Sequence, residues 1–322
     1  MIPSDLGKKC HRILMFRGGA LGDFILTLPA IRALRNARPR VFIELVGRPD
    51  IAELALVSGL IENIVSIDSA RIASYFVPHA ELSSADTAHI RSFDVIISCL
   101  NDPDNVVQSN LIQAGARYVL SIAPQVKSGH AIDHWIKPLR QLGVCGNGRE
   151  MARLDLPARL RAVGKRRLAQ MGLEGSVIAI HPGSGSPKKN WPLPGFMSLA
   201  AKVEHEKCGQ PLFMLGEADE PIVHALKKAK ARFPVLSGCT LLETASILSA
   251  CAGYVGNDSG ITHLAAALGI RTVALFGPTD VDVWAPRGAH VSVVAFQEQD
   301  KKNVARARVS EVFEKLQKTS AD

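Results

Sequence analysis

Residues 255–263, Val-Gly-Asn-Asp-Ser-Gly-Ile-Thr-His, join a strand-like apolar stretch to a helical run over residues 264–268. Asp258 or Ser259 stands where the N-cap of that helix belongs, since short polar side chains accept hydrogen bonds from the first amides of a helix. The segment therefore predicts a turn from a buried strand into a helix.

The start of this helix is also a candidate anion site. The first amides of a helix lack intrahelical partners and carry a partial positive charge, and Gly260 lets a ligand approach the backbone. Ser259 and His263 add side-chain donors within one turn, which suits a phosphate or diphosphate. A well-capped helix with no ligand explains the same residues, so both readings stay open here.

The same alternation of short apolar runs and helical runs extends in both directions along the chain. Short, continuously apolar runs separated by helix-length segments indicate parallel strands that are buried on both faces. The predicted fold class is thus α/β with doubly wound parallel sheets. The expected strands are 13–16, 41–46, 64–67, 94–99 and 117–120 in the N-terminal half, and 177–180, 212–215, 235–236, 253–255, 272–276 and 291–294 in the C-terminal half.

A stretch without periodicity, residues 143–159, separates the two halves and has the glycines and proline of a linker. We expect an N-terminal domain over residues 1–155 and a C-terminal domain over 156–302. Residues 303–322 contain an amphipathic helix, which we expect to dock back toward the N-terminal domain.

Composition restricts the class of protein. The chain has 322 residues, 47% of them hydrophobic, which suffices for two domains with their own cores. Its six cysteines form no C-x-x-C pair and predict free thiols in a reducing compartment. With no segment resembling a signal peptide and no uninterrupted apolar run of transmembrane length, we expect a cytoplasmic protein.

The net charge of +8 implies an anionic partner, and part of it is concentrated in Arg32, Arg35, Arg38 and Arg40. Aromatic residues make up 5% of the chain and are not interleaved with basic ones, which disfavours nucleic acid. A phosphate-bearing glycan or lipid surface is the favoured partner. A solvated helix face explains any single arginine equally well.

The loop after the first expected strand is Arg17-Gly18-Gly19-Ala20-Leu21-Gly22-Asp23. Its glycines permit a tight turn close to a ligand, and Asp23 stands where the loop becomes a helix. Asp23 could be only an N-cap. The loop lacks both the dinucleotide fingerprint G-x-G-x-x-G and the P-loop pattern, so neither a nicotinamide enzyme nor a P-loop ATPase is supported.

Two further loops carry polar groups. Residues 181–192 supply small residues, hydroxyls and two lysines after a buried strand, a mixture that can hold a diphosphate. A flexible basic loop is the alternative. Residues 216–220 offer carboxylates for ribose hydroxyls, although helix capping by Asp219 accounts for part of that pattern.

Together these loops resemble glycosyltransferase family 9, the bacterial heptosyltransferase family. The resemblance spans roughly residues 12–290 and implies a GT-B architecture of two Rossmann-like domains facing a central cleft. It also implies inverting, metal-independent transfer of a heptose from ADP-L-glycero-D-manno-heptose to lipopolysaccharide core or a related glycan. The motifs are Arg17-Gly18-Gly19-Ala20-Leu21-Gly22-Asp23-Phe24 with Leu28-Pro29-Ala30, His181-Pro182-Gly183-Ser184 with Lys189-Asn190-Trp191-Pro192, Gly256-Asn257-Asp258-Ser259-Gly260-Ile261-Thr262-His263, and Leu275-Phe276-Gly277-Pro278-Thr279-Asp280.

The resemblance also implies roles for individual residues. Asp23 corresponds to the general base for the acceptor hydroxyl, and Lys189 to the cation that stabilises the ADP leaving group. Glu220 matches a ribose-binding acid, with Glu217 as the next candidate. The implied donor-binding residues are Ser184, Gly185, Glu220, Asp258, Ser259, Gly260 and His263, and the acceptor-side loop is Arg17, Gly18, Gly19 and Gly22.

We expect no cofactor, no metal and no nucleic-acid partner, an anionic glycolipid acceptor, and peripheral association with the inner face of the inner membrane. A transferase using another nucleotide sugar and a non-catalytic nucleotide-sugar-binding protein are the alternatives. Asp102-Pro103-Asp104 resembles a metal-binding D-x-D motif but is interpreted as a turn. The histidines His79, His89 and His134 receive no role.

Overall fold

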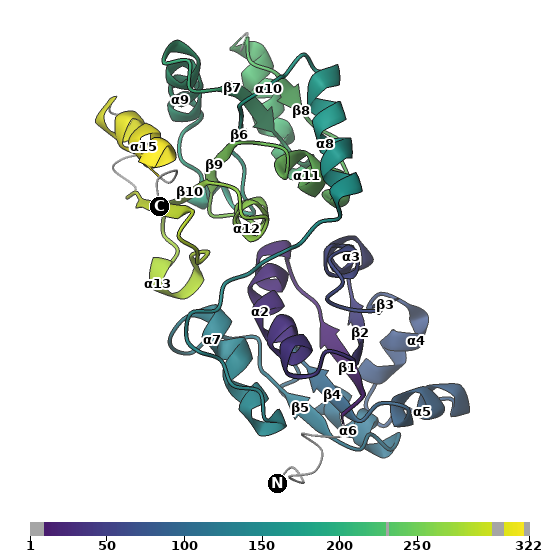
Figure 1. Cartoon of the computed structure of the whole chain (residues 1–322). Coiled ribbons are helices and arrows are strands. Elements are labelled where there is room, and N and C mark those ends of the chain that lie inside the picture. The colour runs from purple at the N-terminus through teal and green to yellow at the C-terminus, as the bar shows by residue number, and fades with distance from the viewer. Residues whose placement is uncertain (1–9, 230–231, 298–305, 319–322) are drawn as a thin grey trace. The chain divides into compact units, whose positions relative to one another are not determined.

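The computed structural model describes residues 10–229, 232–297 and 306–318. The chain divides into two compact units, Met1–Glu150 and Met151–Asp322, five residues before the expected boundary. Each unit contains a parallel sheet with helices packed on it (Figure 1). The predicted fold class, two doubly wound α/β domains, is confirmed.

The sheet of the first unit has five strands in the order β3-β2-β1-β4-β5. Its central strand, β1, is buried from its second residue to its last and pairs in parallel with β2 and β4. Burial on both faces explains why its sequence is almost continuously apolar. The strands are β1 (Arg12–Arg17), β2 (Phe42–Gly47), β3 (Asn63–Ser66), β4 (Val95–Ser98) and β5 (Val119–Ser121), so all five expected strands are confirmed.

The helices of this unit form two groups. Helix α2 (Leu21–Ala37) packs against α3 (Pro49–Val57) and α7 (Ala131–Ile136). The strand residues Leu14 and Phe16 share a hydrophobic core with side chains of the second group, such as Tyr75 and Ile90. The remaining elements are α4 (Ala70–Ala73), η1 (Ser74–Phe76), α5 (Ser84–Arg91), α6 (Val106–Gln113) and η2 (Lys137–Leu142).

The sheet of the second unit has six strands in the order β11-β10-β9-β6-β7-β8, again paired in parallel. Counted from its own first strand, this is the same Rossmann-like order as in the first unit, with one additional strand. All six expected strands are present. They are β6 (Val177–His181), β7 (Gln210–Met214), β8 (Val235–Leu236), β9 (Gly253–Asn257), β10 (Thr272–Phe276) and β11 (Val291–Ala295).

The C-terminal helix α15 (Arg306–Lys318) packs on the second unit. It contacts α9 (Leu193–His205) and strands β9, β10 and β11, and Val309, Val312 and Phe313 belong to the core of this unit. Our expectation that this helix docks toward the N-terminal domain is therefore wrong, because its apolar face is already covered within its own unit.

Helix α8 (Ala158–Gln170) begins inside the expected linker and packs against α11 (Leu241–Leu248). The two helices approach closely at Gly164, where an added Cβ would lie 2.0 Å from the carbonyl oxygen of Ser246. The other helices of this unit are η3 (Pro187–Lys189), η4 (Glu217–Asp219), α10 (Glu220–Lys228), α12 (Gly260–Ala267) and α13 (Val281–Trp284).

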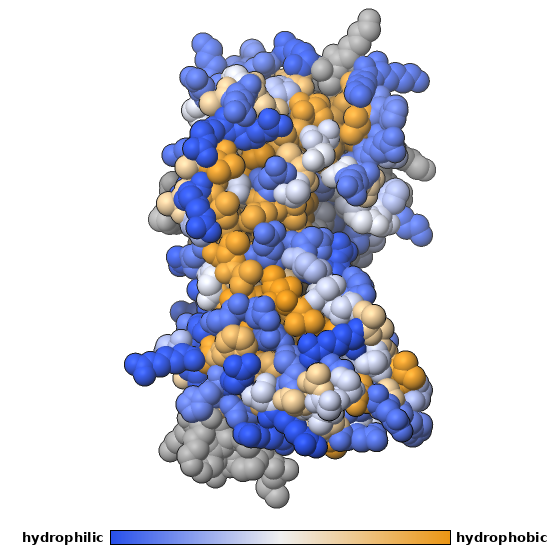
Figure 2. All heavy atoms as spheres, turned by 90° about the vertical axis from the view of Figure 1, so that its right-hand side faces the viewer, coloured by the Kyte–Doolittle hydropathy of each residue, from blue (hydrophilic) through white to orange (hydrophobic). Residues whose placement is uncertain are grey.

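Hydrophilic side chains cover much of the face drawn in Figure 2, with hydrophobic ones exposed in patches between them. Among the described helices, none combines the length and the apolar character needed to cross a bilayer. The six cysteines are free, and two of them, Cys10 and Cys99, are buried. Burial raises the pKa of Cys99 to about 12, so this thiol stays protonated at neutral pH.

Candidate functional site

Three loops meet where strand order reverses in the second sheet. β6 lies between β9 and β7, and His181 at its end pairs with Gly256 of β9. In a doubly wound sheet, ligands bind at the carboxyl ends of the strands at this point of reversal. The loops that follow β6, β7 and β9 are the three that the sequence singled out in this half.

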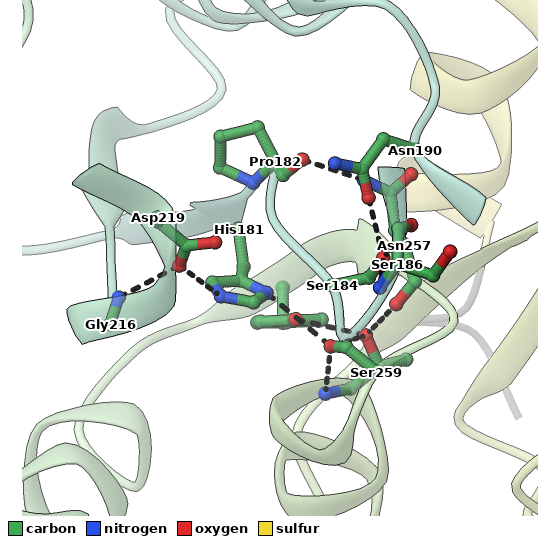
Figure 3. A network of polar contacts seen from close by, with 11 residues as sticks. His181, Pro182, Ser184, Ser186, Asn190, Gly216, Asp219, Asn257 and Ser259 are labelled. Carbon is green, nitrogen blue, oxygen red and sulfur yellow. Dashed lines mark hydrogen bonds and ion pairs between the residues drawn. The ribbon is translucent and has the colours of Figure 1, made fainter. Parts of the chain in front are cut away.

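Asn257, the last residue of β9, ties the first of these loops to the sheet. Its side chain is fully buried and donates from Nδ2 to the Pro182 carbonyl oxygen at 2.7 Å (Figure 3). Its Oδ1 accepts the Trp191 amide at 2.9 Å. Trp191 itself is buried in the core, so both ends of the loop are fixed. No role for Asn257 could be predicted from the sequence, because its partners are more than 60 residues away along the chain.

Lys189 and Asp258 form an ion pair. The Lys189 Nζ lies 2.7 Å from Asp258 Oδ2, and the two side chains are 36% and 6% exposed. Asp258 directly precedes the N-cap of α12, so the pair places an ammonium group beside the start of that helix. A carboxylate cannot itself bind a phosphate favourably, and the geometry therefore gives Asp258 the task of holding Lys189.

Ser259 is the N-cap of α12, and its Oγ accepts the Thr262 amide at 3.3 Å. The amides of Ser259, Gly260 and Ile261 form no hydrogen bond with any described residue. This is the set of unpaired donors that an anion requires. His263 lies one turn into the helix and is buried, at 4% exposure.

The hydroxyl of Ser184 forms hydrogen bonds within the loop that follows β6. Its Oγ accepts the Ser186 amide at 3.2 Å and lies 2.6 Å from Asn190 Oδ1 and 2.7 Å from the Ser186 carbonyl oxygen (Figure 3). A hydroxyl has one proton, so it donates to one of those two oxygens at a time. Gly185, by contrast, has no atom within 4 Å of the position where a Cβ would stand.

Asp219 and His181 form a buried pair that the sequence did not reveal. Both are 5% exposed, and Asp219 Oδ2 lies 3.2 Å from His181 Nε2 while accepting the Gly216 amide at 2.8 Å. Burial alone would raise the pKa of Asp219, but the hydrogen bonds from His181 and Gly216 outweigh it and lower that pKa. A Cβ at residue 183 would stand 1.7 Å from Asp219 Oδ1, so only glycine fits there.

The two ribose-binding candidates lie beside this pair. Glu217 and Glu220 are both exposed, on η4 and at the first residue of α10. The helix capping expected for Asp219 is found as well, since its side chain accepts the amide of Gly216, the N-cap of η4.

In the first unit, the buried side chain of Arg17 holds the glycine loop in place. It is 5% exposed, donates from Nε to Thr27 Oγ1 at 2.9 Å and from Nη1 to the Gly18 carbonyl oxygen at 3.0 Å, and lies 4.6 Å from the ring centre of Trp135. Burial lowers the pKa of Arg17, which the negative charge of Asp23 partly offsets. Gly19 has a φ of 95°, a conformation that favours glycine.

Asp23 is not the N-cap of α2, because that position is Ala20. Asp23 lies in the first helical turn, one residue after Gly22, and is half-buried. Its carboxylate forms no hydrogen bond or ion pair with a described residue, whereas its carbonyl oxygen accepts the Thr27 hydroxyl at 2.9 Å. Its acceptor capacity is therefore available to a ligand.

Three arginines of the cluster make contacts within the protein. Arg35 donates to the carbonyl oxygens of Val41 and Leu60 and pairs with Glu62 at 2.6 Å. Arg38 binds the Leu142 carbonyl oxygen, and Arg32 is also engaged.

Two of the unassigned histidines also have structural contacts. His89 pairs with the buried Glu44 at 2.7 Å, and His134 Nε2 lies 2.7 Å from the Ala123 carbonyl oxygen. Asp102 accepts the Gln108 amide at 3.0 Å and begins a turn, so the interpretation of the D-x-D segment as a turn is confirmed. Within the part of the chain that the structure describes, no group of three or more His, Cys, Asp or Glu could hold a metal ion.

A cavity of about 670 Å³ lies in the first unit between the loop after β5, helix α7 and η2. Three exposed cations line it, Lys127, Lys137 and Arg140, and none of them forms an ion pair with a described residue. Its carboxylates are engaged within the protein: Glu150 accepts the Asn147 amide, and Asp133 also has a partner. The charge left available in this cavity is positive.

Comparison with known proteins identifies the family. Lipopolysaccharide heptosyltransferase 2 of Salmonella typhimurium is 36% identical over 129 residues, which are 38% of this chain and 36% of that relative, so the chain spans about a third of its length.

Two solved structures share the fold. A family 9 glycosyl transferase from Veillonella parvula has a TM-score of 0.77 at 22% identity over 96% of this chain and 97% of its own. The ADP-heptose lps heptosyltransferase II of E. coli has a TM-score of 0.76 at 19% identity over 96% and 100%. The family model "Glycosyltransferase family 9 (heptosyltransferase)" matches residues 121–313, more than half of the sequence, and the chain therefore belongs to glycosyltransferase family 9.

Proposed function

We propose that this protein transfers a heptose from ADP-L-glycero-D-manno-heptose to a sugar hydroxyl of lipopolysaccharide core or a related anionic glycan, with inversion. The observation that carries the proposal is the start of α12, where three unpaired amides stand next to the Lys189–Asp258 pair. That arrangement suits a diphosphate, whose two charges need several donors and a cation. The name of the E. coli structure supports ADP-heptose as the donor.

In the proposed reaction, the acceptor oxygen attacks the anomeric carbon, the bond from that carbon to the diphosphate breaks, and ADP leaves. Asp23 takes the proton of the acceptor hydroxyl, a role that fits a carboxylate with no partner in the described chain. Lys189 and the amides of Gly260 and Ile261 stabilise the negative charge that develops on the leaving group. Glu220 or Glu217 accepts hydrogen bonds from the ribose hydroxyls. The reaction needs no metal or other cofactor in this scheme.

The cavity beside α7 supports an anionic acceptor. Trp135 of α7 contacts Arg17 under the glycine loop, and its helix neighbours Asp133, His134 and Ile136 line the cavity. The cavity is thus in the same unit as Asp23, on a helix packed against α2. Unpaired lysine and arginine side chains there would bind carboxylate or phosphate groups of the acceptor. This cavity is a second proposed site of acceptor attraction beside the arginine cluster. A lipid-anchored acceptor would bring the protein to the inner face of the inner membrane.

The test is incubation of the protein with ADP-heptose and a set of truncated lipopolysaccharide cores, followed by mass spectrometry. A gain of one heptose on one core is expected and would fix donor and acceptor together. Anomeric configuration of the product, read by NMR, tests inversion. Thermal shifts with ADP, UDP and GDP test the base, since a ligand that binds the native state raises the melting temperature. A larger shift with UDP or GDP would contradict the proposed donor.

A further inference from the structure

The side chain of His181 connects the loops after β6, β7 and β9 (Figure 3). On one side, its Nε2 lies 3.2 Å from Asp219 Oδ2. An ionised carboxylate only accepts hydrogen bonds, so this nitrogen carries the proton. Asp219 is fixed in turn by the Gly216 amide at 2.8 Å and by its close packing against Gly183. Asp219 therefore determines both the orientation and the tautomer of His181.

On the other side, His181 Nδ1 lies 3.4 Å from Ser259 Oγ. With Nε2 protonated, the Nδ1 of a neutral imidazole is an acceptor, so the Ser259 hydroxyl is the donor in this contact. Ser259 Oγ already accepts the Thr262 amide as the N-cap. The other nearby oxygen, Thr262 Oγ1 at 3.3 Å, is itself bonded to the Asn257 carbonyl oxygen and to the Tyr254 hydroxyl. Thr262 Oγ1 keeps one acceptor position and Ser259 also contacts the Tyr254 side chain, so His181 Nδ1 is one of the acceptors open to the single proton of Ser259. Donation to His181 directs that proton away from the anion site.

We propose that His181 takes up a proton when the donor diphosphate binds, and that this releases the Ser259 hydroxyl to donate to a phosphate oxygen. The proton comes from solvent and binds Nδ1, and Nδ1–H then donates to Ser259 Oγ. Asp219 stays ionised and stabilises the imidazolium. His181 and Asp219 are positioning residues in this scheme, which depends on the donor site proposed above.

Asp219 favours a charged His181, and a bound anion would add to that effect. Asp219 is the negative group in contact with it, and both side chains are 6% exposed, so water screens their attraction little. Lys189 and Asp258 are paired and largely cancel each other. Tyr254 on β9 is neutral because burial raises its pKa. The remaining titratable groups nearby are His263 of α12, which is buried, and the solvated carboxylates Glu217 and Glu220.

The first experiment measures proton uptake by isothermal titration calorimetry of ADP-heptose in buffers of different ionisation enthalpy. A diphosphate diester does not titrate near neutral pH, so uptake reports on the protein. Wild type should take up a proton when the donor binds, with affinity falling as pH rises, because proton uptake and donor binding are linked. His181→Gln should abolish the uptake and weaken donor binding roughly tenfold, the loss of one charge-assisted hydrogen bond. His205→Gln, at an exposed histidine of the same unit, is the matched control.

The second experiment needs no donor. Nitrogen-15 NMR of labelled histidine should show His181 as the Nε2–H tautomer in the free protein, with its Nδ1 resonance shifted in Ser259→Ala. Asp219→Asn retains an acceptor and should keep this tautomer, whereas Asp219→Ala should lose it. Thermal unfolding shows which variants are folded, and the wild-type spectrum alone tests the tautomer.

The outcomes separate the two proposals. Failure of ADP-heptose to bind would contradict the proposed function. Donor binding without proton uptake, or uptake that persists in His181→Gln, would overturn this inference and leave the donor site intact. A His181 found as the Nδ1–H tautomer would overturn it as well.

Discussion

Replacement of Lys189 by alanine should affect both stability and turnover, and the structure gives a magnitude for each. Two charges 2.7 Å apart attract by roughly 1.5–6 kcal/mol for effective dielectric constants between about 80 and 20. Leaving a fully buried charge without its partner costs about 3–5 kcal/mol. Because Lys189 is 36% exposed, water can reach part of this site, and we expect Lys189→Ala to lower the free energy of unfolding by about 1–3 kcal/mol.

The partner substitution separates the two roles of the pair. Asp258→Asn removes the charge that would be left buried, so the double variant should be less destabilised than the sum of the two single variants, by about 1–2 kcal/mol. Unfolding in urea, followed separately for each unit, measures this coupling. Lys165→Ala, at an exposed lysine on α8, controls for loss of a positive charge from the same unit.

Turnover tests the chemical role of Lys189. If it stabilises the charge on departing ADP, Lys189→Ala should reduce kcat by more than about tenfold. Asp258→Asn should lose less, since the ammonium group remains, and the double variant should resemble Lys189→Ala alone. Wild-type kcat in Lys189→Ala, or strictly additive unfolding energies across the cycle, would refute the reasoning.

Three further predictions follow from other parts of the structure. Asp23→Asn should reduce kcat by roughly a hundredfold or more with donor affinity unchanged, because it removes the proposed base; initial rates and calorimetry check this, and near-wild-type turnover would exclude the role. Gly183→Ala should weaken ADP binding, because a Cβ there lies 1.7 Å from Asp219 Oδ1; an unchanged thermal shift with ADP would contradict it. Burial alone would raise the pKa of Glu44, but hydrogen bonds from His89 and Asn63 lower it from 4.5. Its contribution to stability is therefore complete above about pH 4.5 and is lost as the pH falls through the lower folded-state value, so Glu44→Gln should flatten the acid limb of a stability–pH curve measured by urea unfolding.

The strands could be predicted from the sequence because their signal is local. A strand buried on both faces must be apolar along its length, and β1, β6 and β10 satisfy this without reference to any partner. The N-cap of α12 could also be predicted from the sequence, because a Ser directly before a helical run commonly caps the helix. The alternative that Asp23 is only an N-cap is wrong, because the cap position of α2 is Ala20.

The contacts that build the donor site could not be predicted in this way. Lys189 meets Asp258, and His181 meets Asp219, only because β6 lies between β9 and β7. Strand order depends on how the helices cross over the sheet, which apolar runs alone do not encode. Gly183 was the one local signal for the His181–Asp219 pair, since a glycine just beyond the end of a buried strand indicates that another group lies close to the backbone there.

The two units have separate apolar cores, one centred on residues such as Phe16 and Phe93 and the other on Phe196 and Phe213. In the described chain no side chain belongs to both. Substitutions in one core can therefore be accommodated by repacking within that core. If the first unit binds the acceptor and the second the donor, as proposed, a lineage can acquire a new glycan acceptor through changes in the first unit while it keeps the same nucleotide sugar. Hybrid proteins joined near residue 150 would show whether acceptor choice depends on the first unit.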